Sequence, residues 1–355
     1  MTKIDKIGHP FRMSASRSEP ASDPAGFVLA RLEALAPVLA PGGARVTSLR
    51  RLTGGASLET WAFDIEGSGC VRQLILRRRG GGGEAEVFET SLPLPIEAAL
   101  LQAAENAGAP VARLVRDCAA EDGLGEAYVV ERVAGETLGR RIAVAPAFAR
   151  ARETLGRQCG QALARIHAID PSVLPPLEAQ DARAVLDRYA DIYRKSSGPR
   201  PVMEAALKWM EVRLPASIPP RLVHGDFRNG NLMVDPVTGL AAVLDWELAH
   251  LGDPAEDLGW LCVNSWRFGV TDRVVGGFAD LETLLDAYEA AGGERPSIER
   301  VRFWQAVGTF KWAVVTMMMY RTFATGASRS VERAVIGRRL SECEVDLLAL
   351  MEASR

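Results

Sequence analysis

The segment LVHGDFRNGNLMVD, residues 222–235, gathers polar side chains between apolar ones. It holds one histidine, two aspartates, one arginine and two asparagines within fourteen positions. Asn231 follows Asp226 by five residues, and a further carboxylate, Asp245, follows Asp226 by nineteen. Phosphoryl transfer requires a carboxylate that orients a hydroxyl, hard oxygen ligands for Mg²⁺ and a cation that neutralises charge on the transferred group. Asp226, Asn231, Asp245 and Arg228 supply these groups.

Short β-rich runs surround these polar residues and indicate how they are held. RLVHGD and NLMVD flank the loop, and LAAVLDWE, residues 240–247, carries the second carboxylate. DPVTG between them has the composition of a turn. We therefore expect strands that hold the loop at the floor of a cleft.

Residues 45–133 have the texture of an antiparallel sheet. Four runs are rich in β-forming residues and are separated by turns, namely ARVTSLRRLT, LETWAFDIEG, VRQLILRRR and EAYVVERV. Between the third and fourth runs, PIEAALLQAAENAG begins with proline, ends at Gly108 and has alanine and leucine at helical spacing. One helix is therefore expected to interrupt the sheet.

Beyond residue 133 the pattern becomes helical. Leu155, Cys159, Leu163 and Ile166 form one apolar stripe at helical spacing. A chain of 355 residues exceeds the usual size of a single core, so two lobes around a cleft are expected. The predicted fold class is α+β, with a small N-terminal lobe of antiparallel sheet and one helix and a larger, mainly helical C-terminal lobe.

The composition argues against several classes of function. The chain is 48% hydrophobic and 25% charged with a formal charge of −3, so no nucleic acid partner is expected. Five cysteines without CxxC spacing fit a reducing cytoplasm. The longest apolar run, Trp312–Tyr320, is too short to span a bilayer, so no membrane partner is expected. Residues 1–23 are polar, lack the apolar core of a signal peptide and are expected to be disordered.

The motif HGDFRNGN resembles the catalytic loop of the aminoglycoside phosphotransferase and choline kinase-like family, and VLDWE resembles its metal-binding segment. Both motifs are most similar to those of the kinase-like domains associated with acyl-CoA dehydrogenases. The resemblance runs from about Leu52 to at least Trp260 and implies a bilobal, protein-kinase-like fold. The lobes are then residues 24–133, which bind nucleotide, and residues 134–355, which hold the catalytic loop, the metal site and the acceptor pocket.

Carried over by position, the resemblance assigns a role to each polar residue of the loop. Asp226 matches the residue that accepts the proton of the substrate hydroxyl. Asn231 and Asp245 match the Mg²⁺ ligands, and Arg228 matches a basic position that faces the γ-phosphate. The resemblance assigns His224 to bracing the backbone of the loop.

The resemblance also places the nucleotide. Arg77, where protein kinases have lysine, follows the apolar end of the third strand and would contact phosphate, and Glu97 is its partner in the helix. LTGGASLETW resembles the loop over the ATP phosphates, with Gly55 and Ser57 as contacts. YVVERVAGETL resembles the hinge between lobes, where Glu131 to Val133 would present backbone groups to adenine.

Several other polar positions have two interpretations. Asp253 either caps the helix that begins near Pro254 or contacts substrate. Asp257 either braces the catalytic loop or lies on a solvated helix face, and the role of Glu247 is open. His167 is expected to be a core or C-capping histidine. The aromatic run FWQAVGTFKWAVVTMMMY either belongs to the core or lines an acceptor pocket.

These features predict a cytoplasmic, ATP- and Mg²⁺-dependent phosphotransferase. Its acceptor would be the hydroxyl of a small molecule, which is aminoglycoside-like, a hydroxyacyl compound or another alcohol. The alternative is a nucleotide-binding pseudokinase that acts as an interaction or regulatory module. A homodimer is a possible assembly.

Overall fold

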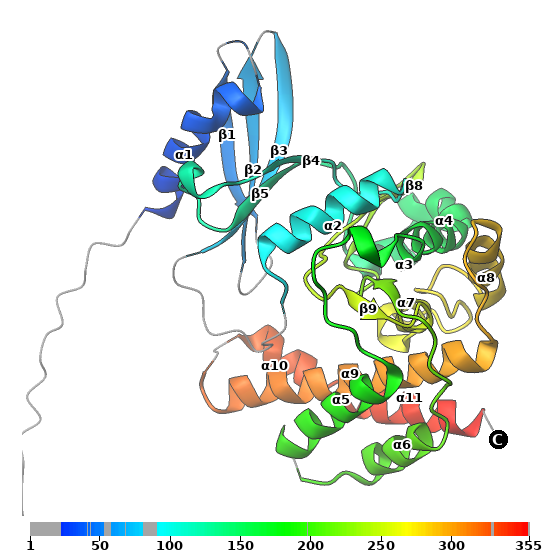
Figure 1. Ribbon diagram of the computed structural model, residues 1–355. Coiled ribbons are helices and arrows are strands. Elements are labelled where there is room, and N and C mark those ends of the chain that lie inside the picture. The colour runs from blue at the N-terminus through cyan, green and yellow to red at the C-terminus, as the bar shows by residue number, and fades with distance from the viewer. Residues whose placement is uncertain are drawn as a thin grey trace, which may run out of the picture.

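The computed structural model describes residues 23–40, 42, 44–52, 58–67, 69–80, 91–196, 198–327 and 330–353. An N-terminal antiparallel sheet and a helical C-terminal part make up the molecule (Figure 1). The sheet has the order β1-β2-β3-β5-β4, formed by β1 (Arg45–Leu52), β2 (Leu58–Gly67), β3 (Cys70–Arg79), β5 (Ala127–Glu131) and β4 (Leu114–Asp117). This confirms the predicted α+β class, although β4 was not predicted.

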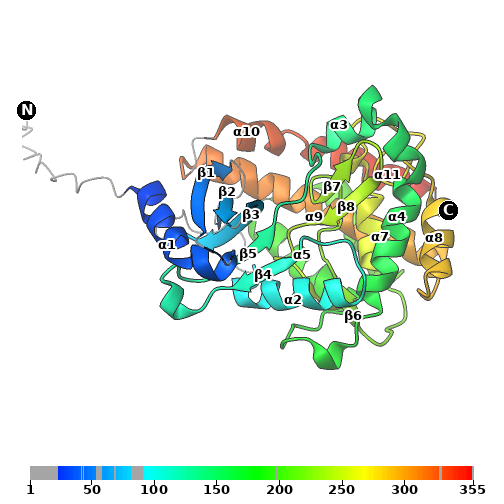
Figure 2. The same ribbon diagram turned by 90° about the horizontal axis from the view of Figure 1, so that it is seen from above.

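Alternation along β3 decides which side chains face the rest of the molecule. Leu74 and Leu76 are fully buried against α1 (Pro24–Leu39), which covers the outer face of the sheet (Figure 2). Arg78 shares that face, because its guanidinium lies 5.2 Å from the ring of Phe27 on α1. Arg77 therefore points to the opposite face, where the helical lobe lies.

The helix α1 is an addition to the predicted elements. Its N-terminus is capped by Asp23, whose Oδ1 accepts hydrogen bonds from the N–H groups of Ala25 and Gly26 at 3.1 and 3.0 Å. Residues 1–22 of the predicted disordered terminus lie outside the described residues.

The predicted interrupting helix is α2 (Leu94–Asn106), which lies between the sheet and the helical lobe (Figure 1). Both flanks of α2 are hydrogen-bonded to the C-terminal lobe. Before it, the N–H of Leu92 donates to the carbonyl of Glu247 at 2.8 Å. After it, Pro110 accepts from the N–H of Val243 at 2.7 Å.

The predicted apolar stripe lies on α4 (Ala149–His167) and is buried. Gly160 on α4 lets α8 (Leu281–Ala290) approach closely, because an added Cβ there would lie 2.5 Å from the carbonyl oxygen of Leu284. The helices of this lobe are α3 (Gly139–Val144), α4 (Ala149–His167), α5 (Ala182–Ser196), α6 (Pro201–Glu211), α7 (Ala255–Leu261), α8 (Leu281–Ala290), α9 (Ile298–Ala324), α10 (Val331–Gly337) and α11 (Leu340–Glu352). No helix of the described ranges is long and apolar enough to cross a membrane.

Two small antiparallel pairs hold the polar motif. β6 (Arg221–Val223) pairs with β9 (His250–Gly252), and β7 (Leu232–Asp235) pairs with β8 (Gly239–Val243). The loop at residues 224–231 joins β6 to β7, and residues 244–249 join β8 to β9. The predicted strands around the motif are present, and β9 completes them.

Candidate active site

The carboxylate of Asp226 is held by three side-chain donors. Its Oδ1 accepts from Arg228 Nε at 2.9 Å and from Trp260 Nε1 at 2.7 Å, and its Oδ2 accepts from Asn231 Nδ2 at 2.6 Å. The Asp226 side chain is 14% exposed. Hydrogen bonds to an ionised acceptor are short and strong, so these donors fix the direction of both oxygens.

The backbone of the loop is held from behind by Asp257 on α7. Its carboxylate accepts from the N–H groups of His224 and Gly225 at 2.7 and 2.9 Å. Burial alone would raise the pKa of Asp257, but the hydrogen bond from His167 and the nearby histidines hold this pKa below its ordinary value. Asp257 is therefore a fully buried, ionised brace and not a residue of a solvated helix face.

His224 also braces the loop, as the resemblance implies. Its Nε2 lies 3.0 Å from the carbonyl of Leu244, and its Nδ1 accepts from the N–H of Asp226 at 3.2 Å. This arrangement places the proton on Nε2 and leaves Nδ1 as acceptor. Burial lowers the pKa of His224, so the ring stays neutral and both nitrogens are already used.

His167 is a buried core histidine, as expected, and it belongs to the same network. Its Nε2 lies 3.0 Å from the Asp257 carboxylate, and its Nδ1 lies 3.0 Å from the hydroxyl of Tyr288 on α8. The loop at residues 224–231 is thus connected through Asp257 and His167 to α4 and α8.

Asp245 has the left-handed backbone conformation, with φ of 65°. Among residues with a side chain, aspartate and asparagine adopt this conformation most readily. The turn lets Asp245 Oδ1 accept from Arg77 Nη2 at 2.9 Å, which joins the sheet to the helical lobe. The predicted phosphate contact and the predicted metal ligand are therefore adjacent.

Arg77 and Glu97 lie close together, as the resemblance implies, but with a longer separation than Arg77 and Asp245. Arg77 Nη2 is 3.8 Å from Glu97 Oε2, and the hydroxyl of Tyr128 donates to the same oxygen at 3.1 Å. Burial raises the pKa of Glu97 to about 7, and Arg77 only partly offsets this. The pKa of Arg77 is raised further above its ordinary value, because Tyr128, Glu97 and Asp245 outweigh its burial.

Glu247 is a second carboxyl with a raised pKa beside this pair. Burial, followed by the charge of Asp245, raises its pKa to about 7. Its Oε2 accepts from the hydroxyl of Ser91 at 3.4 Å. Arg77 is thus paired with Asp245 and close to Glu97, and Glu247 lies within electrostatic range of both carboxyl groups.

Asn231 and Asp245 fit the requirements of a Mg²⁺ site. Asn231 donates through Nδ2 to Asp226, so its side-chain oxygen remains available as a ligand. The N–H of Leu244 donates to the carbonyl of Asn231 at 2.8 Å and ties the two ligand segments together. One amide oxygen and one carboxylate are the hard ligands that Mg²⁺ takes when substrate phosphates complete its shell.

The other residues predicted to contact nucleotide lie between β1 and β2 in the sequence and at the end of β5. Gly55 and Ser57 lie outside the described residues. At the hinge, the N–H of Glu131 donates to the carbonyl of Arg113 at 2.9 Å, and the Glu131 carboxylate pairs with Arg72 and Arg113. No hydrogen bond within the described ranges involves the backbone of Val133.

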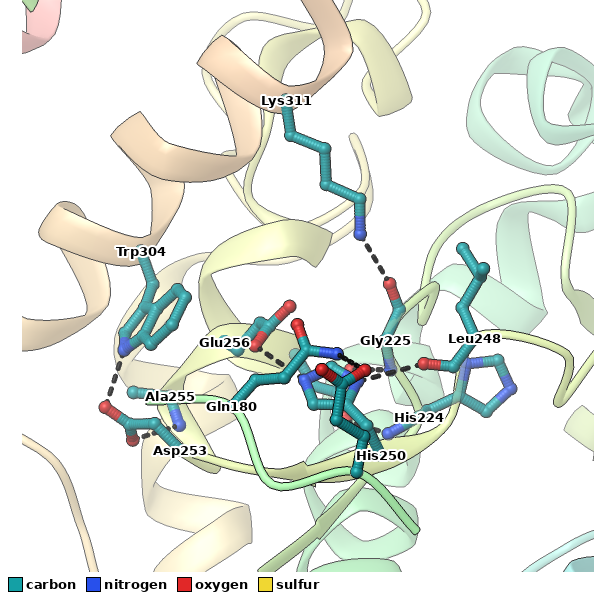
Figure 3. A network of polar contacts seen from close by, with 12 residues as sticks. Gln180, His224, Gly225, Leu248, His250, Asp253, Ala255, Glu256, Trp304 and Lys311 are labelled. Atoms are coloured by element: carbon teal, nitrogen blue, oxygen red, sulfur yellow. Dashed lines mark hydrogen bonds and ion pairs between the residues drawn. The ribbon is translucent and has the colours of Figure 1, made fainter. Parts of the chain in front are cut away.

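Asp253 has a structural role. Its Oδ1 accepts from the N–H of Ala255 at the start of α7, and its Oδ2 accepts from Trp304 Nε1 on α9 at 2.6 Å (Figure 3). The same Oδ2 also accepts from Arg300 Nε on α9 at 2.8 Å. This confirms the capping interpretation. The aromatic run of α9 is largely core, because Trp304, Val307 and Phe310 are buried.

Trp260 is a site residue that sequence reasoning missed. It lies 34 residues from Asp226 and begins an indole cluster, with ring centroids 5.1 Å apart between Trp260 and Trp266 and 4.8 Å apart between Trp266 and Trp312. The guanidinium of Arg228 lies 4.5 Å from the Trp266 ring. No local sequence pattern indicates such a tertiary contact.

A cavity of about 1000 Å³ lies elsewhere, between the end of α4, the segment before β6 and the start of α9. None of the predicted catalytic, metal or nucleotide residues lines it. Asp226 does not line this cavity, whereas His167 and Asp253, which belong to the network around the loop, form part of its wall.

The chain is similar to known phosphotransferases and to parts of larger proteins. A model of the phosphotransferase enzyme family matches residues 48–304. Acyl-CoA dehydrogenase family member 10 of Mus musculus is 25% identical over 78% of this chain and 27% of its own length. The probable acyl-CoA dehydrogenase IBR3 of Arabidopsis thaliana is 25% identical over 79% of this chain and 37% of its own length. The chain thus spans about a third of these relatives.

Solved structures share its fold. A provisionally named aminoglycoside phosphotransferase from Ralstonia eutropha has a TM-score of 0.70 at 21% identity, with 91% of this chain and 98% of that chain covered. A choline/ethanolamine kinase family protein from Mesorhizobium loti has a TM-score of 0.59 at 21% identity, covering 91% and 94%. A spectinomycin phosphotransferase in complex with ADP and spectinomycin has a TM-score of 0.60 at 12% identity, covering 90% and 98%. These likenesses show the protein-kinase-like fold.

Proposed function

Because the chain belongs to the phosphotransferase enzyme family, we propose that it transfers the γ-phosphate of ATP to a hydroxyl of a small molecule with the help of Mg²⁺. The observation that carries this proposal is the fixed carboxylate of Asp226, held by Arg228, Trp260 and Asn231. Asp245, on the segment after β8, accepts a hydrogen bond from Arg77 of β3.

Asp226 would orient the attacking hydroxyl. The substrate oxygen forms a bond to the γ-phosphorus while the bond from that phosphorus to the β–γ bridging oxygen breaks, and ADP leaves. The hydroxyl proton passes to the carboxylate of Asp226. Because three donors hold this carboxylate in one direction, it presents the remaining lone pair of Oδ2 to the hydroxyl without reorganisation.

The other residues would bind and neutralise phosphate. Asn231 and Asp245 would hold Mg²⁺, which when bound supplies positive charge to the phosphate oxygens. Arg77 lies at Asp245 and offers further N–H donors for phosphate. Arg228 keeps its charge beside Asp226 and is placed to balance negative charge on the transferred group.

The surroundings of Asp226 favour an alcohol with apolar character. Indole rings and the guanidinium of Arg228 lie next to the Asp226 carboxylate. A polycationic aminoglycoside would meet like charge there. A hydroxyacyl compound fits better, and it agrees with relatives that are named acyl-CoA dehydrogenases.

The proposal is tested by following ADP formation against a panel of alcohols, including hydroxyacyl compounds and aminoglycosides. Asp226→Asn should lower turnover roughly 10²- to 10⁴-fold, as expected for loss of a general base. The exposed Asp272→Asn serves as the matched control and should keep wild-type turnover. Unchanged turnover in Asp226→Asn contradicts the mechanism.

Nucleotide binding is measured separately by thermal shift. MgATP at about 100 times its dissociation constant should stabilise the fold by roughly 2.7 kcal/mol. Stabilisation without ADP formation across the panel would support the pseudokinase alternative. No stabilisation would remove both functions.

A further inference from the structure

A buried lysine on α9 lies directly behind the catalytic loop. Lys311 is 9% exposed, and its Nζ donates to the carbonyl oxygen of Gly225 at 3.0 Å (Figure 3). Nζ also lies 4.8 Å from the ring centroid of Trp260 and 5.7 Å from that of Tyr189. Charged side chains are rarely buried without a specific partner, so these contacts define what this ammonium does.

The first contact fixes a peptide unit. The carbonyl of the Gly225–Asp226 peptide is bound by Lys311, and its N–H is bound by His224 Nδ1 at 3.2 Å. Gly225 has φ of 76°, and its own N–H is held by Asp257. Because the plane of this peptide sets the direction in which the Asp226 side chain leaves the backbone, Lys311 helps to aim that side chain.

The second contact fixes a donor to the carboxylate. Trp260 donates through Nε1 to Asp226 Oδ1 at 2.7 Å, while the ammonium of Lys311 lies against the indole ring. A desolvated cation over an indole face is an attractive contact. Lys311 therefore acts on Asp226 by two routes, through the backbone and through the indole.

The ammonium remains charged in this position. Burial lowers the pKa of Lys311, but Tyr189 and the carboxylates of Glu256, Asp226 and Asp257 outweigh burial and raise it. Glu256 is itself paired with His250 at 3.2 Å (Figure 3) and directly precedes Asp257, which binds the loop backbone.

We propose that Lys311 is a positioning residue for phosphoryl transfer, which fixes the Gly225–Asp226 peptide and the Trp260 indole so that the Asp226 carboxylate keeps one orientation. Its effect on turnover rests on the proposed function. Lys311 acts through other residues and has no contact with the reacting atoms.

The kinetic experiment compares three substitutions of Lys311 with a surface control. Lys311→Met keeps the apolar stem but leaves the Gly225 carbonyl without its donor, and should lower kcat roughly 10- to 100-fold with an unchanged KM for MgATP. Lys311→Arg, which keeps the charge and the donor, should restore most of kcat. Lys208→Met, at a side chain that is 77% exposed, should match the wild type.

Lys311→Gln keeps an N–H donor without the charge and provides a second variant if the methionine protein does not fold. Its kcat should lie between those of Lys311→Met and wild type. The positioning role is overturned if kcat is unchanged in both Lys311→Met and Lys311→Gln. It is also overturned if these variants have a lower melting temperature but the kcat of the wild type.

A spectroscopic experiment tests the same inference without turnover. In protein labelled with ¹⁵N-tryptophan, the indole N–H resonance of Trp260, assigned with Trp260→Phe, should move in Lys311→Met and return in Lys311→Arg. The resonance of Trp61, in the sheet, should stay in place. An unmoved Trp260 resonance overturns the inference, whereas absence of ADP formation by the wild type overturns the proposed function alone.

Discussion

At the scale of single residues, the site depends on a buried carboxylate, Asp257, that fixes the backbone of the loop carrying Asp226. Asp257 has no exposed surface and binds two backbone N–H groups of the loop, while Asp226 is bound by three side chains. The orientation of Asp226 thus depends on Asp257, which binds the backbone of the loop, and on the side chains that bind the Asp226 carboxylate itself. Changes to these groups should therefore alter stability and turnover together.

Asp257→Asn keeps the side-chain shape but turns one acceptor oxygen into a donor. The N–H groups of His224 and Gly225 and the ring of His167 would then share one oxygen. We expect the free energy of unfolding, measured in urea, to fall by about 2–4 kcal/mol. Asp187→Asn, at a side chain that is 63% exposed, should change it by less than about 0.5 kcal/mol. Equal stabilities of the two variants would contradict the bracing role.

Glu97 predicts a pH dependence of stability. Its pKa is raised from 4.5 to about 7, so the folded protein binds this proton more tightly than the unfolded chain does. Stability should therefore fall as pH rises between these values and level off above them, by on the order of 3 kcal/mol from this group. The glutamine of Glu97→Gln cannot ionise, so this variant should lack the loss of stability that Glu97 causes in the wild type.

The measurement is urea unfolding of both proteins at pH 5 and pH 8, with chelator and without nucleotide. Between pH 5 and pH 8, the free energy of unfolding should fall more for the wild type than for Glu97→Gln. Parallel stability curves for the two proteins would show that Glu97 titrates normally.

Much of the site follows from residue spacing, because its chemistry is concentrated in short segments. Asp226, Asn231 and Arg228 lie within one loop, and the structure brings Asp245 and Arg77 to it. Trp260 and Lys311 could not be found in this way. They reach Asp226 from α7 and α9 through contacts that depend on tertiary packing, and their local sequence has the pattern of core helices.

At the scale of elements, close helix contact depends on small residues. An added Cβ on Gly160 of α4 would lie 2.5 Å from the carbonyl oxygen of Leu284 and 2.9 Å from the nitrogen of Tyr288, both backbone atoms of α8. Tyr288 in turn contacts the His167 ring. The spacing of α4 and α8 therefore supports the network behind the catalytic loop.

Gly160→Ala should destabilise the protein by about 1 kcal/mol or more. The overpacking cost of roughly 1–3 kcal/mol or more exceeds the gain of about 1 kcal/mol in helix propensity. Gly198→Ala is the control, because an added Cβ there meets no atom within 4 Å. Thermal and urea unfolding of both variants measure the change in the free energy of unfolding. An increase in Gly160→Ala would contradict the prediction and show that α8 moves away without cost.

The elements that were predicted have strong periodicity or clear end signals, and those that were missed do not. The β2–β3 hairpin and α2 follow from alternation and from proline and glycine at their ends. β4 and β9 are four and three residues long and exist only because partners pair with them. α1 had a usable signal in the Asp23–Pro24 cap, but its glycine and internal Pro37 weaken the helical pattern.

At the scale of the whole molecule, the two lobes share one core. A single buried cluster contains Leu94 and Leu101 of α2 together with Leu155 and Leu163 of α4. A separate cluster joins α1 to the outer face of the sheet. The boundary between lobes at residue 133 stays a prediction, since α2 packs with the helices although it lies within the N-terminal lobe by sequence.

This packing predicts the order of opening in hydrogen exchange. Amides of α2 should exchange at the rate of those of α4, because the flanks of α2 are bonded to Glu247 and Val243. Amides of β1, at the edge of the sheet, should exchange faster. Exchange mass spectrometry of the full chain measures both, and exchange of α2 together with β1 would contradict the shared core.

The attachment of α2 also bears on how two copies of this chain could associate. The backbone leaves the sheet after β3, is tied to the helical lobe around α2, returns for β4 and β5, and leaves again towards α3. Three covalent passages thus link the sheet to the rest of the molecule. Domain swapping exchanges an identical element between two chains and is simplest when one hinge connects that element to the rest. Exchange of this sheet would require all three connections to change their path. Dimers of this protein are therefore expected to form through outer surfaces with each sheet retained by its own chain.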